Sequence, residues 1–248
     1  MKKQTIRWIL LILCAGIFCF CVFQVARVRL RGNREQGAFD RLTEQAARRD
    51  DTTPAGEVLE RFHALLAENG DLRGWLTIPD TGIDYPVMQS ELDREYYLHR
   101  AFDRSDSVSG TPFLDFACTP ESDCVIVYAH NMKNGTMFGT LDRYLRQDYR
   151  DAHPTIWFDS LTEEREYEVF AAVQTRVYGT GAPGFHYYES AGTLTASERR
   201  QLVDWLLERS VWDCGVTPEE DDQILILSTC SYHTQDGRFL IAARRIER

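Results

Sequence analysis

The sequence lacks the patterns by which many proteins are assigned to a class at once. No C-x-x-C pair occurs among its seven cysteines, which argues against a structural zinc site. The six histidines show no paired ligand spacing, so we expect no bound metal, and no cofactor is predicted. Internal repeats and low-complexity segments are also missing. What is left is an ordinary globular composition in 248 residues, enough for one sizeable domain with accessory segments.

Acidic residues are absent from positions 1–34, which carry seven basic ones: Lys2, Lys3, Arg7, Arg27, Arg29, Arg31 and Arg34. The whole chain has a net charge of −10, so residues 35–248 sum to −17. A body that acidic does not favour nucleic-acid binding, because phosphates require a basic surface. The basic N-terminal cluster favours anionic lipid instead.

Charged side chains are missing from residues 8–26, a run of 19 residues with only Gln24 strongly polar. A helix of this length is about enough to cross the ~30 Å hydrocarbon layer. A cleaved signal peptide has a shorter apolar region that ends at an A-x-A-like site, and neither condition is met. A lipoprotein cysteine is disfavoured because the bulky Leu13 precedes Cys14. The sequence therefore predicts an uncleaved, single-pass anchor in the cell membrane.

This anchor divides the chain into three predicted parts. Residues 1–34 form a cytoplasmic tip and the transmembrane anchor, with a helix at about 8–26. Residues 35–56 form a polar, partly helical stalk, and residues 57–248 form the folded body. Both flanks of the anchor are basic, so the positive-inside rule alone does not place the body outside the cell.

The body contains short strands and few helices. A packing helix is predicted at 57–69, with Gly70 as its C-terminal stop. Two strands flank a turn at Pro79–Gly82, and further strands are predicted near Gly110–Phe116, Cys124–Ala129, Ile156–Phe158, Glu166–Val177, Ile224–Leu227 and Phe239–Ile246. Several short strands separated by turns indicate a barrel or a sandwich.

A capping-box match, Thr195 to Glu198, precedes an amphipathic run and predicts a helix there. This helix is inserted in a connection of about 45 residues between the strand that ends near Tyr178 and the strand that begins at Gln223. Connections of this length are often functional.

The last two strands are predicted to form a hairpin, with a turn at Asp236-Gly237. If they pair antiparallel, Cys230 and Arg238 face each other across its mouth. A thiol beside a fixed cation favours the thiolate, which is the nucleophilic form. A buried cysteine beside a solvated arginine is equally compatible with this stretch alone.

A histidine, His130, follows the buried strand 124–129, and Asn134-Gly135 then makes a turn. An imidazole there is well placed for proton transfer, although histidines at strand ends are often only solvated. Cys118 and Cys124 bracket a turn-rich insert between two apolar runs. If those runs form a hairpin in an oxidising environment, the two thiols are predicted to form a disulfide.

In their order along the chain, these segments resemble the sortases, and class B in particular. The resemblance rests on Tyr128-Ala-His-Asn-Met132 before Met137-Phe-Gly139, then Leu227-Ser-Thr-Cys230 with Arg238 eight positions on, and on the early segments 74–79, 84–89, 96–102 and 110–115. It covers most of residues 57–248. The segment 90–95, Ser-Glu-Leu-Asp-Arg-Glu, is more acidic than the family pattern.

The resemblance implies a mainly β (α+β) fold. This is a closed eight-stranded sortase-type β-barrel with N-terminal helices and a helix inserted before the cysteine strand. It also implies that residues 57–248 are an extracytoplasmic sortase catalytic domain with a triad of His130, Cys230 and Arg238.

The same resemblance suggests residues that hold the substrate. By alternation, Ser228 lies on the same strand face as Cys230, and it is assigned with Thr229 to substrate binding. Ordinary strand-end hydrogen bonding by Ser228 is equally compatible. Tyr187 and Tyr188, in the long connection, are predicted walls of the groove.

The implied activity is that of the membrane-anchored cysteine transpeptidases of Gram-positive bacteria. Cys230 would attack a threonine carbonyl in a C-terminal sorting signal, and a thioester acyl-enzyme would form. The implied partners are surface proteins with sorting signals, and an acceptor amine from a peptidoglycan precursor (lipid II) or a pilin. A membrane-anchored cysteine hydrolase that uses water is the nearest alternative. An inactive surface binding module is disfavoured because all three chemical positions are filled.

Overall fold

The computed structural model describes residues 2–47, 53–179, 181–231 and 233–246. The chain consists of two compact units, Met1–Arg41 and Leu42–Arg248. The second unit includes residues 42–47 and 53–56, which were assigned to the stalk on sequence. Helix α1 spans Lys2–Ala46, so helical structure continues well into that segment.

The predicted anchor lies on α1. Among the residues that the structure describes, none of the helices has a window with the length and hydropathy that crossing a membrane requires. Part of the predicted span, positions 9, 10, 12, 25 and 26, has side chains outside the described residues.

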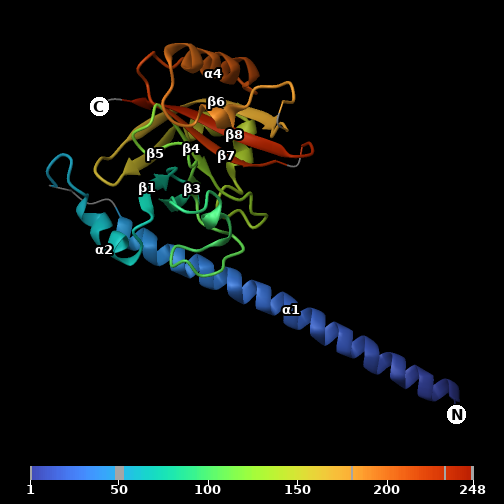
Figure 1. The fold of residues 1–248 in the computed structure, drawn as a ribbon. Helices are drawn as coiled ribbons and strands as arrows, with labels where there is room; N and C mark the ends of the chain where they lie inside the picture. The colour runs from blue at the N-terminus through green and yellow to red at the C-terminus, as the bar shows by residue number, and fades with distance from the viewer. Residues whose placement is uncertain (1, 48–52, 180, 232, 247–248) are drawn as a thin grey trace. The chain divides into compact units, whose positions relative to one another are not determined.

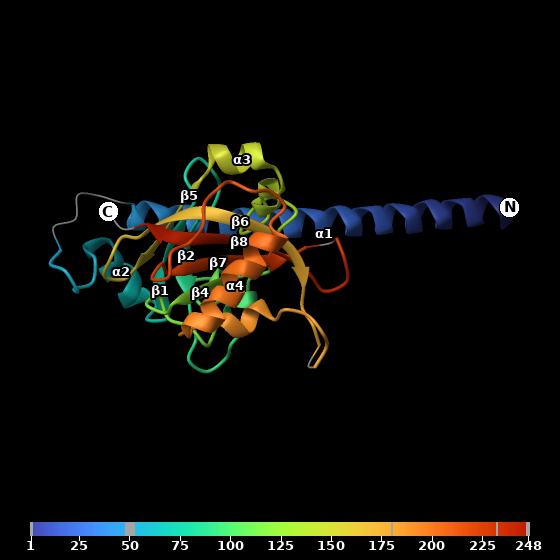
Figure 2. The same cartoon turned by 90° about the horizontal axis from the view of Figure 1, so that it is seen from above.

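The second unit is built on a closed β-barrel with the strand order β1-β2-β3-β4-β7-β8-β6-β5 (Figures 1 and 2). The strands are β1 (Leu72–Thr77), β2 (Asp84–Met88), β3 (Phe113–Leu114), β4 (Cys124–Tyr128), β5 (Thr155–Ser160), β6 (Glu166–Arg176), β7 (Ile224–Cys230) and β8 (Gly237–Ile246). The helices are α2 (Glu60–Glu68), α3 (Gln147–Ala152) and α4 (Ala196–Arg209), with 3-10 turns η1 (Tyr96–His99), η2 (Leu141–Leu145) and η3 (Tyr187–Ser190). The predicted eight-stranded barrel with a helix before the cysteine strand is confirmed.

Three neighbouring strands, β4, β7 and β8, are buried on both faces. One face packs against α4: Ile126, Ile226 and Leu240 lie in a cluster with Leu202 and Leu206 of that helix. The alternate residues of the same strands, such as Val127, Leu227 and Ile241, are fully buried on the opposite face. Burial on both faces explains why these strands are nearly continuous apolar runs rather than alternating ones.

Helix α4 begins as the sequence predicts. The Thr195 hydroxyl accepts a hydrogen bond from the Glu198 N–H, and the Glu198 carboxylate accepts one from the Thr195 N–H. This reciprocal pair satisfies two N–H groups that an uncapped helix leaves without partners. Within the long connection, α4 packs on the outside of the barrel, against β6, β7 and β8 (Figure 2).

The predicted turn at Asp236-Gly237 is present, but the two residues have different roles from those expected. Asp236, not the glycine, takes the left-handed conformation, with φ of 54°. Gly237 is required for another reason, because a Cβ there would lie 2.3 Å from the Ser231 carbonyl oxygen. The backbone at the start of β8 therefore lies very close to the backbone just after β7, and a side chain at position 237 would push the two strands apart.

One local prediction was too long, and another was wrong. The strand expected at 110–116 is reduced to Phe113–Leu114, because Gly110 takes a positive φ of 62° and Pro112 has no N–H to donate. Cys118 and Cys124 are free thiols and not a disulfide. The Cys118 thiol instead contacts the carbonyl oxygens of Asp115 and Ile126, at 3.5 and 4.0 Å. Both thiols are buried, and burial raises the pKa of each, so both are held in the uncharged form.

Candidate active site

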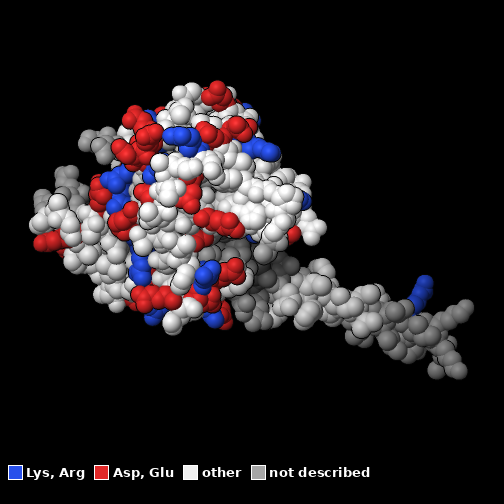
Figure 3. All heavy atoms as spheres, turned by 45° about the horizontal axis from the view of Figure 1, so that its top comes forward, with Lys and Arg blue, Asp and Glu red and all other residues white. Residues whose placement is uncertain are grey.

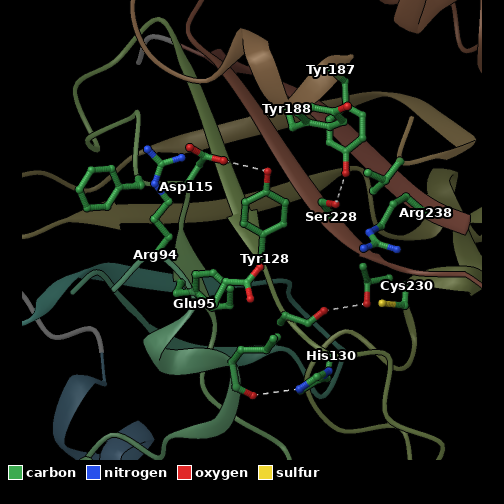
Figure 4. Close-up of a pocket in the computed structure, with 16 residues that line it drawn as sticks. Arg94, Glu95, Asp115, Tyr128, His130, Tyr187, Tyr188, Ser228, Cys230 and Arg238 are labelled. Carbon is green, nitrogen blue, oxygen red and sulfur yellow. Dashed lines mark hydrogen bonds between the residues drawn. The ribbon is translucent and has the colours of Figure 1, made fainter. Parts of the chain in front are cut away.

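Strand register brings three chemical groups together. Strands β4 and β7 run parallel with Tyr128 opposite Ser228, and the Ala129 N–H continues the pairing to the Ser228 carbonyl at 3.3 Å. Two residues after Tyr128, His130 follows the end of β4, and two residues after Ser228, Cys230 is the last residue of β7. Strands β7 and β8 run antiparallel with Cys230 opposite Arg238. The nucleophile candidate therefore lies between an imidazole and a guanidinium at the ends of three adjacent strands (Figure 4).

Two side-chain hydrogen bonds hold the ends of β4 and β7 in this register. The Thr229 hydroxyl donates to the Ala129 carbonyl at 2.8 Å, and the Asn131 amide donates to the Cys230 carbonyl at 2.9 Å. The Thr229 side chain is buried, and alternation places it on the face opposite Cys230. Its hydroxyl therefore joins two strands, and Thr229 is also among the residues that line the pocket described next.

A pocket of about 420 Å³ opens beside these three groups. It is lined by Arg94, Glu95, Leu98, Phe113, Asp115, Phe116, Tyr128, Ala129, His130, Val177, Tyr187, Tyr188, Ser228, Thr229, Cys230 and Arg238. Its volume lies in the range of ligand sites, and its mostly apolar walls surround a few polar groups, as such sites require. All seven site residues predicted from the sequence line this one pocket.

His130 is oriented by a loop that sequence reasoning did not connect to it. Its Nε2 lies 2.9 Å from the Leu98 carbonyl in η1. Because a carbonyl only accepts, Nε2 carries the proton in this bond, and Nδ1 is the unprotonated nitrogen of the neutral ring. Burial lowers the pKa of His130, the bond to Leu98 works in the opposite direction, and nearby His99 lowers it further. The two imidazole rings lie 5.6 Å apart, centroid to centroid.

The cation opposite the thiol is anchored by its own hairpin. Arg238 Nη1 donates to the Gly237 carbonyl at 3.0 Å, with a longer approach to the Asp236 carbonyl at 3.5 Å. A guanidinium has five N–H donors in a planar fork, so it can still donate to a ligand carbonyl. Cys230 itself is exposed, and its thiol is therefore accessible from the pocket.

A second pair of side chains lies next to Cys230 on the same strand face. The Tyr187 hydroxyl and the Ser228 hydroxyl are 2.8 Å apart, and both residues are buried. Burial raises the pKa of Tyr187, and the bond to Ser228 partly opposes this. The Tyr188 hydroxyl donates to the Tyr178 carbonyl at 2.9 Å, which fixes the long connection as one wall of the pocket.

The wall opposite that connection contains residues that sequence reasoning missed. The Tyr128 hydroxyl donates to Asp115 at 2.9 Å, and burial raises the pKa of Tyr128. Arg94 lies over the ring of Phe116 at 5.0 Å. Glu95 and Leu98 complete this wall. The one sequence signal for it was the unusual acidity of residues 90–95.

Within the described part of the chain, no group of three or more His, Cys, Asp or Glu side chains is arranged to hold a metal ion. The chemistry available in the pocket is that of an exposed thiol, a neutral imidazole and a permanent cation. This combination can perform acyl transfer. A thiolate attacks a carbonyl, N–H donors stabilise the oxyanion, and an imidazole moves the protons.

Comparisons with known proteins agree with this geometry. A profile of the Sortase domain matches residues 76–246. Sortase B of Listeria monocytogenes is 32% identical over 239 residues, 93% of each chain. Sortase B of Bacillus anthracis, solved in complex with AAEK1, has 27% identity and a TM-score of 0.75 over 88% of this chain and 99% of that one. A Staphylococcus aureus sortase B–substrate complex has 25% identity and a TM-score of 0.73, over 88% and 99%.

Proposed function

Since this chain belongs to the sortase family of cysteine transpeptidases, we propose that Cys230 is its nucleophile, with His130 and Arg238 as partners. The substrate is a C-terminal sorting signal of a surface protein, cleaved after threonine. The observation that carries this proposal is the register of β4, β7 and β8. It places Cys230 opposite Arg238 and His130 at the matching end of the parallel strand, at one pocket.

The first step forms the acyl-enzyme. The Cys230 sulfur bonds to the threonine carbonyl carbon, and the thiol proton passes to His130. The C–N bond of the scissile amide then breaks, and His130 gives that proton to the departing amine. Arg238 donates N–H groups to the oxyanion that develops on the carbonyl oxygen. A lowered pKa suits His130 to this exchange, because its neutral form can accept the proton and its charged form is a stronger acid.

The second step releases the product. An incoming amine attacks the thioester carbonyl, the C–S bond breaks, and the surplus proton of the amine returns through His130 to the sulfur. The acceptor that we propose is an amine of a peptidoglycan precursor such as lipid II, or of a pilin. Because Cys230 is exposed, water can also reach the thioester, so hydrolysis is the second candidate outcome of the same intermediate.

The test uses threonine-containing sorting peptides labelled for cleavage. We expect intact-mass measurements to show a thioester adduct on the wild-type chain, and amine addition to convert it to an amide product. Cys230→Ala should lose the adduct and reduce cleavage by about a thousandfold or more, with an unchanged circular dichroism spectrum. Cys214→Ala, which removes another free thiol, is the matched control and should keep both. Cleavage by Cys230→Ala at the wild-type rate would refute the assignment.

We also propose that residues 1–34 hold the enzyme in the cell membrane, with the catalytic domain outside. This is supported by the uncharged run 8–26 and the basic residues on both of its sides. The full chain should remain with membranes after an alkaline carbonate wash, whereas a variant that lacks residues 1–34 should be released. Release of both would exclude an integral anchor.

A further inference from the structure

Both residues that approach the His130 ring from η1 lie between Tyr97 and Phe102. The Leu98 carbonyl bonds to Nε2 of His130 at 2.9 Å, and the His99 ring lies 5.6 Å from the imidazole, centroid to centroid. Tyr97 and Phe102 are not among the described residues that line the pocket. Whatever fixes Tyr97 and Phe102 therefore also fixes the surroundings of the imidazole, from outside the pocket.

One buried amide holds both ends of this segment. Asn69, which follows α2, is 2% exposed, and its Nδ2 donates to the Tyr97 hydroxyl at 2.9 Å and to the Phe102 carbonyl at 2.6 Å. Its Oδ1 accepts from the Arg104 guanidinium at 2.9 Å and from the Asp71 N–H at 3.0 Å. Both N–H donors and both lone pairs of the amide are thus used. The Asn69 side chain cannot rotate without losing several of these bonds at once.

Tyr97 is held from a second side by a carboxylate. Its hydroxyl donates to Asp71 at 2.7 Å, and the residue is 1% exposed. Burial, and next the bond to Asp71, raise the pKa of Tyr97 to about 12, so the hydroxyl keeps its proton at neutral pH. On the face seen in Figure 3, acidic and basic side chains are interspersed. Exposed pairs of that kind contribute little to stability, whereas the loss of a buried hydrogen-bond partner is costly.

The backbone around the Leu98 carbonyl is closely packed as well. The Tyr97 carbonyl accepts a hydrogen bond from the Thr111 N–H at 2.9 Å. Gly110, with φ of 62°, lies directly against the next carbonyl, because a Cβ at position 110 would be 2.5 Å from the Leu98 oxygen. A shift of η1 would therefore change the position of this oxygen relative to His130.

We propose that Tyr97 is a positioning residue for the reaction: its buried hydroxyl, held by Asn69 and Asp71, fixes η1 so that the Leu98 carbonyl keeps the His130 proton on Nε2. Nδ1 of the neutral ring is then free to accept a proton. The inference rests on the proposed function, in which His130 moves the protons. Tyr97 acts through Leu98 and not on the substrate.

The experiment compares the full chain in detergent with Tyr97→Phe, which removes the hydroxyl and keeps the ring. Two-bond 1H–15N NMR spectra, at a pH at which the ring is neutral, give the fraction of His130 with its proton on Nε2. We expect this form to dominate in the wild-type chain and a mixture of tautomers in the variant. With a threonine-containing sorting peptide, kcat should fall about fivefold, because a displaced proton-transfer group loses part of its contribution. KM should change by less than about twofold, because the pocket lining is intact.

Two further changes separate positioning from general loss of stability. Tyr167→Phe removes an equally buried hydroxyl, which donates to Gln223 at 2.6 Å, at the end of β7 opposite Cys230. This matched control should leave the tautomer and kcat unchanged. Asp71→Asn keeps an acceptor for the Tyr97 hydroxyl and should behave much like the wild type, whereas Asp71→Ala removes the acceptor and should behave like Tyr97→Phe.

The proposal is overturned if Tyr97→Phe changes only the tautomer, only kcat, or neither. It is also overturned if Tyr167→Phe changes both as strongly, because the effect would then be a general loosening of the fold. Failure of the proposed function has a different signature. It appears as the absence of an adduct on Cys230 in the wild-type chain, whatever the tautomer of His130.

Discussion

At the scale of single residues, the protonation of His130 depends on one short turn. Leu98 of η1 fixes the tautomer through its carbonyl, and the next residue, His99, places a second imidazole 5.6 Å from the first. Burial is the largest cause of the lowered pKa of His130, and the proximity of His99 adds to it. A second imidazole disfavours the charged form of the first because both would be cations.

We therefore expect His99→Gln to raise the pKa of His130. The change should be modest, because burial, the larger cause, remains. An NMR titration of the His130 ring resonances measures it directly. The acid limb of the kcat/KM profile should move to higher pH in the same variant, since His130 would then be protonated at a higher pH.

The control for that titration is His63→Gln. His63 is an exposed residue of α2, and its Nε2 lies 3.0 Å from the Val58 carbonyl oxygen, far along the sequence from His130. The His63→Gln variant should leave the titration of His130 unchanged. If His99→Gln also leaves it unchanged, the proximity of the two rings has no electrostatic consequence.

Which site residues were predictable depended on how far apart in sequence their contacts lie. Cys230 and Arg238 were found because a tight hairpin makes them neighbours, and the register of its two strands follows directly from the turn. The bond from His130 to Leu98 joins residues 32 apart, and the Tyr187–Ser228 contact joins residues 41 apart. No periodicity or turn signal encodes such contacts, so they required the folded structure.

At the scale of secondary-structure elements, β7 determines the site. It lies between the parallel strand β4 and the antiparallel strand β8, so its last residue, Cys230, is opposite Arg238 and beside the end of β4 that His130 follows. Its apolar run was recognised in the sequence because both of its faces are buried. The parallel pairing with β4 was not predicted, because the two strands are about 100 residues apart and their pairing has no local signal.

Local rules succeeded where the deciding atoms are close in sequence. The capping box of α4 needs only Thr195 and Glu198, and both of its bonds are present. The same local rules failed where contacts between residues distant in sequence determine the structure. The apolar run around Phe113 is mostly irregular. Only one residue pair joins it to β2 and two residue pairs join it to β4 in the described sheet. The Cys118 thiol contacts the Ile126 carbonyl rather than Cys124, which a spacing rule does not reveal.

At the scale of the whole molecule, the sequence separated an apolar N-terminal run from an acidic body, but the edge of the folded unit lies elsewhere. Leu42 and Ala46, in the last turns of α1, are 1% and 5% exposed and belong to the unit Leu42–Arg248. The Thr43 hydroxyl also donates to the Asp84 carbonyl of β2 at 3.3 Å. The polar composition of residues 35–56 concealed these few buried positions among many charged ones.

This edge predicts how N-terminal truncation affects stability. A variant that begins at residue 57 should be less stable than one that begins at residue 35 by about 2–4 kcal/mol, because burial of a leucine contributes about 1.5–3 kcal/mol and Ala46 adds to it. The midpoint of urea unfolding measures the difference. In the longer variant, Leu42→Ala should account for most of the loss, whereas Glu44→Ala, at an exposed position of the same turn, should change little. Equal stability of the two truncated proteins would show that residues 42–46 are a spacer and that the folded unit begins at residue 57.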